Sequence, residues 1–496
     1  MKKILLLFIT ALVIFTCACA GGDTDKPNSG DQNEGEEIVS PQSGSESEED
    51  SGAEIDVMTL IPEQNLGGFE LRFLTDIIWD WDFGPLHMMC VEEQTGEPVN
   101  DAMYIRNAIV EERLNMTISE TVSKNNDSKN MIRKIINAGS DEYDVLLAES
   151  WNIGGTLVTA DLLMNLTEIP EFSFDSVWWD YASIRDYTIG DKLYFVTGDH
   201  NLISNDATWM LFFNKQMVQD VGLDLPYELV RDGKWTFDKQ IEYMRAAARD
   251  VDGDGIWSYD DIWGQVSHTQ HYTGLLFAAG ENLITRDGYG MPVFGEITER
   301  FYNVYDKIQE IMKSPGYTHN VYVNIPKAPS SRHATYEFLA NSALFCPEIL
   351  AHTRRFRQME SDFGVLPHPK YDEAQQQYYS YVLGQVTVTC IPITNQNLTQ
   401  TAAVLDALAM LSAHTIQPAY YEISLIGKFF RDDESADMID IIRRSRVYGI
   451  ADAYSWGNAT NAFQDAALGN AGITSYFEKN EGKINNAIEK TLESFN

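Results

Sequence analysis

The sequence is poor in basic residues. Its 496 residues contain 36 Lys and Arg against 74 Asp and Glu, which gives a formal net charge of −38. A chain with so few bases repels phosphate backbones and anionic headgroups, so we expect neither nucleic-acid binding nor membrane binding through a folded surface. The hydrophobic fraction of 44% excludes a wholly disordered chain, and the length predicts two or three domains.

Cysteine is also scarce, with five residues in the whole chain. Cys17 and Cys19 lie in the N-terminal segment, while Cys90, Cys346 and Cys390 are too far apart for a disulfide framework. One pairing among the last three is compatible with the sequence, but buried free thiols are the favoured interpretation.

The N-terminal segment holds an apolar run, Ile4–Phe15, that follows Lys2 and Lys3 and is too short to span a bilayer in the usual way. An ordinary signal peptide is one interpretation. We favour a bacterial lipoprotein signal over residues 1–18, with Cys19 as the lipidated first residue of the mature chain. Ala18 fits the lipobox pattern, whereas Thr16 departs from the usual Leu. This hypothesis anchors the protein to the extracellular face of the cell membrane by lipid.

The next segment, 19–56, contains few apolar side chains and many acids, with Lys26 as its one base. Such a stretch cannot bury enough surface to fold, and its like charges extend it. We therefore predict a disordered acidic tether over 19–56 and a folded part over 57–496.

The folded part opens with a β-α-β-α-β series. Alternating apolar and polar residues predict strands at 69–74 and 117–122, and an apolar run predicts a buried strand at 143–148. Apolar residues at helical spacing predict helices at 101–114, capped by its first residue Asp101, and at 131–139. This order is typical of an α/β fold with a parallel sheet, whose ligands bind beyond the carboxyl ends of the strands.

Tryptophans occur in the loops that leave those strand ends. Trp79 and Trp81 follow the first strand, and Trp151 follows the third, between Glu149 and Asn152. An exposed Trp is costly unless it is covered or used for binding. Packing under the loop and ligand binding are equally favoured for Trp79 and Trp81, whereas binding is favoured for Trp151.

Five further segments, in a fixed order, resemble a known family. They are IINAGSDEYDVLLA at 135–148, GG at 154–155 with LLMNL at 162–166, GDKLYFV at 190–196, WMLFFNK at 209–215, and VGL at 221–223 with WTF at 235–237. The order is similar to that of family 1 extracellular solute-binding proteins, the sugar-capturing lipoproteins of ABC importers typified by maltose-binding protein. The resemblance covers nearly all of 66–496.

This resemblance implies a periplasmic-binding-protein-like α/β fold, with two α/β lobes whose central sheets are joined by a hinge. The implied segments are lobe 1 at about 66–206 and 372–422, lobe 2 at about 212–366 and 428–496, and crossings near 207–214, 367–381 and 423–427. It also implies a binding protein, not an enzyme, that captures a sugar or oligosaccharide between the lobes and delivers it to the transmembrane subunits of an ABC permease.

Trp79 and Trp81 are candidate ligand-binding residues because they follow a strand end, and the other candidates are carried over from the family by position. The candidates are Trp79, Trp81, Glu149, Trp151, Asn152, His271, Tyr272, Tyr381 and Trp456. Aromatic rings pack against the apolar faces of a pyranose, while carboxylates, amides and imidazoles bond its hydroxyl rim. The family often has Asp at the position of Trp151 and an aromatic near Glu348, so maltodextrin specificity does not carry over.

The segment 250–261, DVDGDGIWSYDD, has the spacing of an EF-hand calcium loop. The predicted ligands of a structural Ca²⁺ are Asp250, Asp252, Asp254, the carbonyl of Ile256, Ser258 and Asp261. A helix is predicted before the loop, but Gly264 comes too early for a helix after it. The alternative is an Asx-rich surface turn.

Two other functions stay open at this point. A secreted, lipid-anchored glycan hydrolase needs a pair of carboxylates at a defined separation, which an acidic sequence can supply. A binding protein for a peptide or another small solute differs only in the chemistry of its cleft. His268 has no evident carboxylate partner in the sequence, so an ordinary polar loop is favoured there.

Overall fold

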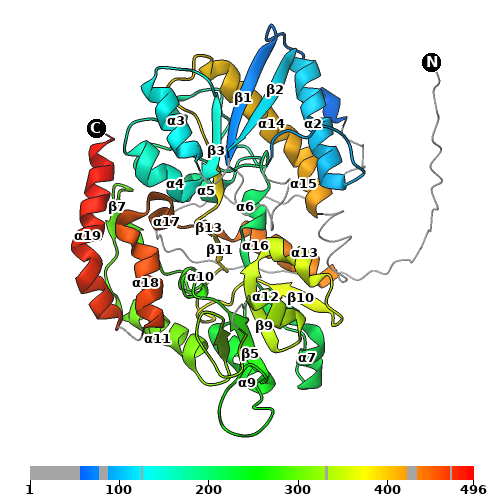
Figure 1. Ribbon diagram of the computed structural model, residues 1–496, viewed down its shortest axis with the longest axis vertical. Coiled ribbons are helices and arrows are strands. Elements are labelled where there is room, and N and C mark those ends of the chain that lie inside the picture. The colour runs from blue at the N-terminus through cyan, green and yellow to red at the C-terminus, as the bar shows by residue number, and fades with distance from the viewer. Residues whose placement is uncertain are drawn as a thin grey trace, which may run out of the picture. The chain divides into compact units, whose positions relative to one another are not determined.

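The computed structural model describes residues 56–76, 88–123, 127–329, 333–421, 433–469 and 472–495. The predicted signal segment, the lipidation site Cys19, nearly all of the tether, and both Trp79 and Trp81 lie outside these ranges. Over the described ranges, no helix has both the length and the apolar character needed to cross a membrane. The strands form two main sheets and two separate strand pairs, which Figure 1 shows with their surrounding helices.

The first sheet has the order β12-β3-β1-β2. Its elements are β1 (Phe69–Asp76), α2 (Pro98–Leu114), β2 (Met116–Ser123), α3 (Ser128–Asn137), β3 (Val145–Glu149), β12 (Thr387–Cys390) and α14 (Leu398–His414). β1 runs parallel to β2 and β3, and β12 is antiparallel to β3. The predicted β-α-β-α-β series is therefore confirmed, and right-handed crossovers place α2 and α3 on opposite faces of the sheet.

The predicted cap of the first helix is wrong. α2 begins at Pro98, and the carboxylate of Glu97 accepts the N–H groups of Val99 (3.0 Å) and Asn100 (3.2 Å). Asp101 instead accepts hydrogen bonds from two residues before the helix. Proline has no N–H to satisfy and a fixed φ, which favours it at the first helical position and places the cap at Glu97, on the N-terminal side of the predicted one.

The second sheet has the order β10-β4-β9-β5-β8, with β5 parallel to β8 and β9 and with β4 antiparallel to β9 and β10. Its elements and those near it are α6 (Ile203–Asp206), β4 (Trp209–Asn214), α7 (Lys215–Asp220), α8 (Tyr227–Arg231), α9 (Phe237–Ala247), β5 (Trp263–Ser267), α10 (His271–Ala278), β6 (Ile284–Arg286), β7 (Pro292–Phe294), α11 (Glu299–Lys313), β8 (Thr318–Asn320), α12 (Ala334–Leu339), β9 (Ala343–Ile349), α13 (Thr353–Phe356) and β10 (Phe363–Leu366). The lobe boundaries themselves stay a prediction.

One C-terminal helix, α17, packs closely against two glycines in the turns that follow β3 of the first sheet. The C-terminal elements are α15 (Ile416–Pro418), α16 (Asp433–Arg444), β13 (Arg446–Tyr448), α17 (Ile450–Tyr454), α18 (Ala459–Leu468) and α19 (Ile473–Glu493). α17 lies against α4 (Ser150–Ile153) and the π-helical turn after it. A Cβ atom would lie 2.5 Å from the Ala453 carbonyl oxygen if placed on Gly154, and 2.5 Å from that of Tyr454 if placed on Gly155. Only glycine allows this contact.

Three segments meet where the chain passes between the two sheets. Thr208, which leads into β4, bridges Val382 of β11 (Ser380–Val382), and β11 pairs in parallel with β13. The crossings predicted near 207–214 and 367–381 end in or next to these segments. The crossing predicted near 423–427 lies outside the described residues.

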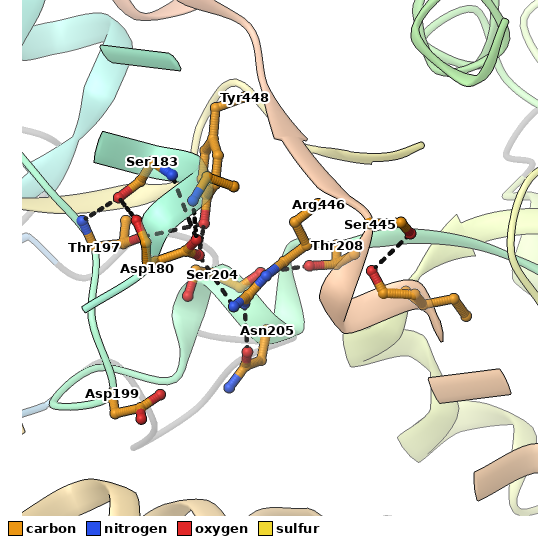
Figure 2. A network of polar contacts seen from close by, with 12 residues as sticks. Asp180, Ser183, Thr197, Asp199, Ser204, Asn205, Thr208, Ser445, Arg446 and Tyr448 are labelled. Atoms are coloured by element: carbon orange, nitrogen blue, oxygen red, sulfur yellow. Dashed lines mark hydrogen bonds and ion pairs between the residues drawn. The ribbon is translucent and has the colours of Figure 1, made fainter. Parts of the chain in front are cut away.

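A buried polar network holds this junction together, as Figure 2 shows. Arg446 of β13 pairs with Asp180 (3.1 Å), the N-cap of α5 (Tyr181–Tyr187), and donates to the Asn205 side-chain oxygen of α6 (2.6 Å). The Tyr448 hydroxyl donates to the same Asp180 carboxylate at 2.5 Å. The network thus fixes β13, and with it β11, against α5 and α6.

We expect Arg446→Met to lower the free energy of unfolding by about 3 kcal/mol, because it leaves the Asp180 carboxylate buried without its cationic partner. Urea unfolding measures the change. Arg444→Met is the matched control: Arg444 forms an exposed pair with Asp440 on α16, and its loss should cost under about 0.5 kcal/mol. Equal destabilisation by the two variants would contradict this role of Arg446.

Candidate functional site

A cavity of about 270 Å³ lies at the carboxyl end of β3, beside α17. Its lining residues are Trp151, Gln270, Tyr381, Leu383, Gly384, Gln385, Ala451, Asp452, Ser455, Asn458, Ala459, Thr460, Asn461 and Gln464. They come from α4 after the first sheet, from the N-terminus of α10 after β5 of the second sheet, and from the segments after β11 and β13. The cavity is therefore built from both sheets and the C-terminal helices.

Trp151 provides the aromatic surface of the cavity. Trp151 is the second residue of α4, which follows β3 directly, and it remains 36% exposed. The indole N–H donates to Glu149, and the Asn152 amide donates to the same carboxylate oxygen at 2.9 Å. Lys129 in turn donates to the side-chain oxygen (Oδ1) of Asn152 at 2.8 Å. Of these neighbours, only Trp151 lines the cavity, and the other two predicted residues hold its ring in place.

Glu149 lies behind Trp151 and is buried. Burial raises the pKa of its carboxyl to about 7; the hydrogen bond from Trp151 opposes this shift, the charge of Asp76 adds to it, and Lys129 opposes it. Asp76 ends β1 as Glu149 ends β3, so the parallel strands bring both carboxylates to one edge of the sheet. The Glu149 carboxyl therefore changes between its protonated and its ionised form near neutral pH.

Asp452 forms the acidic part of the cavity wall. It accepts a hydrogen bond from the Tyr381 hydroxyl (2.8 Å), which itself accepts from the Gly384 N–H (3.1 Å). Burial raises the pKa of Asp452, partly offset by hydrogen bonds from Thr460 and Tyr381. A Cβ atom on Gly384 would lie 2.4 Å from the Asp452 side chain, so this position needs glycine.

The rest of the polar lining is uncharged. Seven neutral polar side chains line the cavity: Gln270, Gln385, Ser455, Asn458, Thr460, Asn461 and Gln464. No Lys, Arg or His is among the described residues of this lining. Such a surface provides many hydrogen-bond donors and acceptors without positive charge, which suits a polyhydroxylated neutral ligand more than an anion.

Three predicted ligand residues lie away from the described cavity lining. His271 and Tyr272 are buried in α10, and Trp456 is buried against α19, where its indole N–H donates to the Thr491 hydroxyl at 2.8 Å. The ring of Trp456 also stacks on that of Tyr454, with 4.9 Å between the ring centroids. Burial in these helices is an effect of tertiary packing, which the local sequence does not indicate.

The expectation that His268 lacks a carboxylate partner is wrong. His268 Nε2 lies 3.1 Å from a carboxylate oxygen of Glu348, and His352 Nδ1 lies 2.9 Å from the other oxygen. Glu348 belongs to β9, which is parallel to β5, and β5 ends just before His268. Because the two positions are 80 residues apart, sequence spacing carried no signal for this contact.

The predicted calcium loop gathers three of its six residues. One carboxylate oxygen each from Asp250, Asp252 and Asp254 lies within 4.8 Å of the others. Asp261 is buried and accepts the N–H groups of Val251 (2.9 Å) and Ser258 (2.6 Å). The helix α9 precedes the loop, as predicted. The loop is followed by the strand β5, which agrees with the prediction that no helix comes directly after it.

The three thiols outside the N-terminal segment are free. Cys346 and Cys390 are buried, as favoured from the sequence, and Cys90 is partly buried.

No protein-family model matches the chain, and no curated protein matches its sequence. Solved structures match its fold. The sugar-binding protein MalE from Xanthomonas citri aligns with a TM-score of 0.59 at 12% identity, over 86% of this chain and 99% of its own. The protein has a periplasmic-binding-protein fold. Two other solved structures match the same fold. Mycobacterium tuberculosis UspC aligns with a TM-score of 0.56 at 13% identity, over 84% of this chain and 100% of its own. A Listeria monocytogenes ABC substrate-binding protein in complex with cycloalternan aligns with a TM-score of 0.51 at 10% identity, over 86% of this chain and 99% of its own.

This fold confirms the fold class predicted from the sequence, and it explains which site residues the sequence missed. Asp452 and the amides of α18 come from the C-terminal segment, far along the chain from Trp151. No local sequence pattern marked these residues, because they are spread over 452–464 among small and aromatic residues.

We expect Glu149→Gln to change how stability depends on pH. An acid whose pKa rises on folding binds its proton more tightly when folded, so its contribution to stability falls as pH increases from about 4.5 to about 7. The free energy of unfolding of the wild type, relative to Glu149→Gln, should fall by roughly 2–3 kcal/mol between pH 4.5 and 8. Urea unfolding at each pH measures this difference, and Glu168→Gln, at an exposed position, is the control. Parallel pH profiles of stability for the wild type and Glu149→Gln would refute the raised pKa of Glu149.

Proposed function

We propose that this protein is a solute-binding protein of an ABC importer that captures a neutral sugar or oligosaccharide in the cavity beside Trp151. The observation that carries this proposal is the cavity's composition, one partly exposed indole opposite a wall of amides and hydroxyls, without a basic side chain among its described residues. The indole packs on the C–H face of a pyranose, and the amides and hydroxyls bond its rim.

The relatives in fold support the same class of ligand. One is named a sugar-binding protein, one is an ABC substrate-binding protein in complex with cycloalternan, and a third, with a TM-score of 0.52, is a cyclo/maltodextrin-binding protein complexed with maltotetraose. These proteins bind solutes and are not named as enzymes. In this role the chain delivers its solute to the permease subunits from the extracellular face of the membrane, held there by lipid on Cys19 and by the tether.

We expect Trp151→Ala to weaken sugar binding about tenfold or more, since truncating a central aromatic side chain removes both contact area and its stacking geometry. Thermal shift against a panel of neutral oligosaccharides that includes maltotetraose finds the ligand, and calorimetry then measures Kd. Tyr181→Ala is the control, because Tyr181 is 71% exposed and outside the cavity lining.

The same samples separate this proposal from its alternatives. Release of shorter glycans from any panel member would favour the hydrolase, for which Glu149, buried behind Trp151, and Asp452, partly buried in the cavity wall, are candidate carboxyls. Binding of peptides but of no oligosaccharide would refute the sugar assignment.

We also propose that the loop 250–261 binds a structural Ca²⁺. The proposal is supported by the EF-hand spacing, by the three converging carboxylates, and by Gly253 and Gly255, whose φ values of +73° and +79° allow the sharp turns. Lys327 pairs with Asp252 and Asp260 at 3.2 Å each, so the ion competes with an ammonium group at the rim.

Calcium should therefore raise the melting temperature, and EDTA should lower it, with half-saturation on the order of 0.1–1 mM. In Asp254→Asn the response should disappear, although the side-chain oxygen that accepts from Ile256 N–H (2.7 Å) is kept. The exposed Asp232→Asn should respond like the wild type. A melting temperature that ignores both calcium and EDTA would refute the site.

A further inference from the structure

A relay of hydrogen bonds connects the cavity wall to a buried carboxylate. Gln270 lines the cavity at the N-terminus of α10, and its side-chain oxygen lies 2.6 Å from His268 Nδ1. The other ring nitrogen of His268 meets Glu348, whose second oxygen meets His352. The side chains of His268 and Glu348 are 13% and 2% exposed, so the relay is shielded from water except at its Gln270 end.

The geometry determines where the protons lie. Burial raises the pKa of Glu348, but the two imidazoles beside it more than offset this effect and hold its pKa well below the usual range. The carboxylate is thus ionised and accepts N–H bonds from both rings. His268 donates to it through Nε2, so a donated bond from Nδ1 to the Gln270 oxygen requires an imidazolium with both nitrogens protonated.

Every element packed around His268 bears on that charge. Glu348 of β9 favours the imidazolium, His352 of the following turn opposes it, and His271 of α10 and His333 before α12 are further imidazoles nearby. Trp209 of β4 and Tyr322 after β8 flank the ring at 5.2 and 6.1 Å. Burial lowers the pKa of His268, but Glu348 and the hydrogen bond to Gln270 outweigh burial, and the net pKa is raised.

We propose that Gln270 is a specificity-determining residue of the cavity and that His268, held by Glu348, is the positioning residue that decides whether Gln270 presents an amide N–H donor or a carbonyl acceptor to the ligand. The proposal rests on the proposed function insofar as the ligand occupies this cavity.

With His268 charged, the Gln270 oxygen faces the ring, and the amino group has no partner among the residues whose contacts the structure describes. The cavity then offers a donor. When His268 loses its Nδ1 proton, the hydrogen bond to the Glu348 carboxylate keeps the other proton on Nε2, and Nδ1 becomes an acceptor. The Gln270 amide must then rotate by half a turn to donate to Nδ1, and the cavity receives a carbonyl acceptor instead.

The decisive measurement needs no ligand. In the full chain with ¹⁵N-labelled His and Gln, the His268 ring nitrogens should titrate from imidazolium to the Nε2–H tautomer, and the Gln270 side-chain NH₂ signals should move with the same midpoint. His268→Gln and Gln270→Ala assign the signals. Glu348→Gln should lower that midpoint by about one pH unit, because it removes the opposite charge. Gln270 signals that ignore the His268 titration would overturn the proposal.

A binding arm tests the consequence. For the tightest oligosaccharide in the panel, raising the pH from below to above the His268 midpoint should weaken binding about fivefold in the wild type. In Gln270→Ala the affinity should change less than twofold over the same range. An unchanged wild-type affinity would overturn the specificity role. If no panel member binds, the proposed sugar function fails, while the NMR titration still decides the amide reorientation.

Discussion

The close contact between Gly154–Gly155 and Ala453–Tyr454 is the constraint on which the site depends. It packs α17 against the turns that follow β3 so closely that no Cβ atom fits on Gly154 or Gly155. α17 can then place Asp452 and Ser455 beside Trp151, and the next helix adds its amides. The junction network around Arg446 supports the same arrangement because it holds β13 in place. β13 leads into α17, and it pairs with β11, which carries Tyr381. A pair of glycines thus determines which distant segments share one cavity.

Three acids near this region, two buried and one partly buried, show how hydrogen-bond donors affect the charge of a carboxyl. Glu348 faces two imidazoles, and its pKa falls well below the usual range. Glu149 accepts hydrogen bonds from the Trp151 indole and the Asn152 amide, and burial raises its pKa to about 7. The pKa of Asp452 is also raised, because its hydroxyl donors are neutral. Neutral donors stabilise a carboxylate less than cationic ones do, so Asp452 in the cavity wall and Glu149 behind Trp151 hold less charge than Glu348 of the relay.

Sequence reasoning succeeded where the signal was local. Alternation and helical spacing predicted the strands and helices of the first sheet, and the order of short segments led to the fold. Trp151 lies in the cavity because the segments that follow strand ends are positioned by the fold itself, and Tyr381 reaches it from β11. Trp456 was misjudged, and Asp452 and Glu348 were missed, because their surroundings come from contacts between residues far apart in sequence. The polarity of neighbouring residues does not report such contacts.

The acidic character of the chain also constrains its ligand. With a formal net charge of −38, the protein repels anionic solutes over several ångströms. The described residues of the cavity lining include no basic side chain that would reverse this repulsion. Charge can therefore exclude anions but cannot distinguish one neutral sugar from another. Discrimination between neutral ligands must come from the shape of the indole wall and from the direction of each hydrogen bond. A glutamine whose amide can face either way is then a strong determinant of selectivity, since its donor and its acceptor favour different groups on otherwise similar ligands.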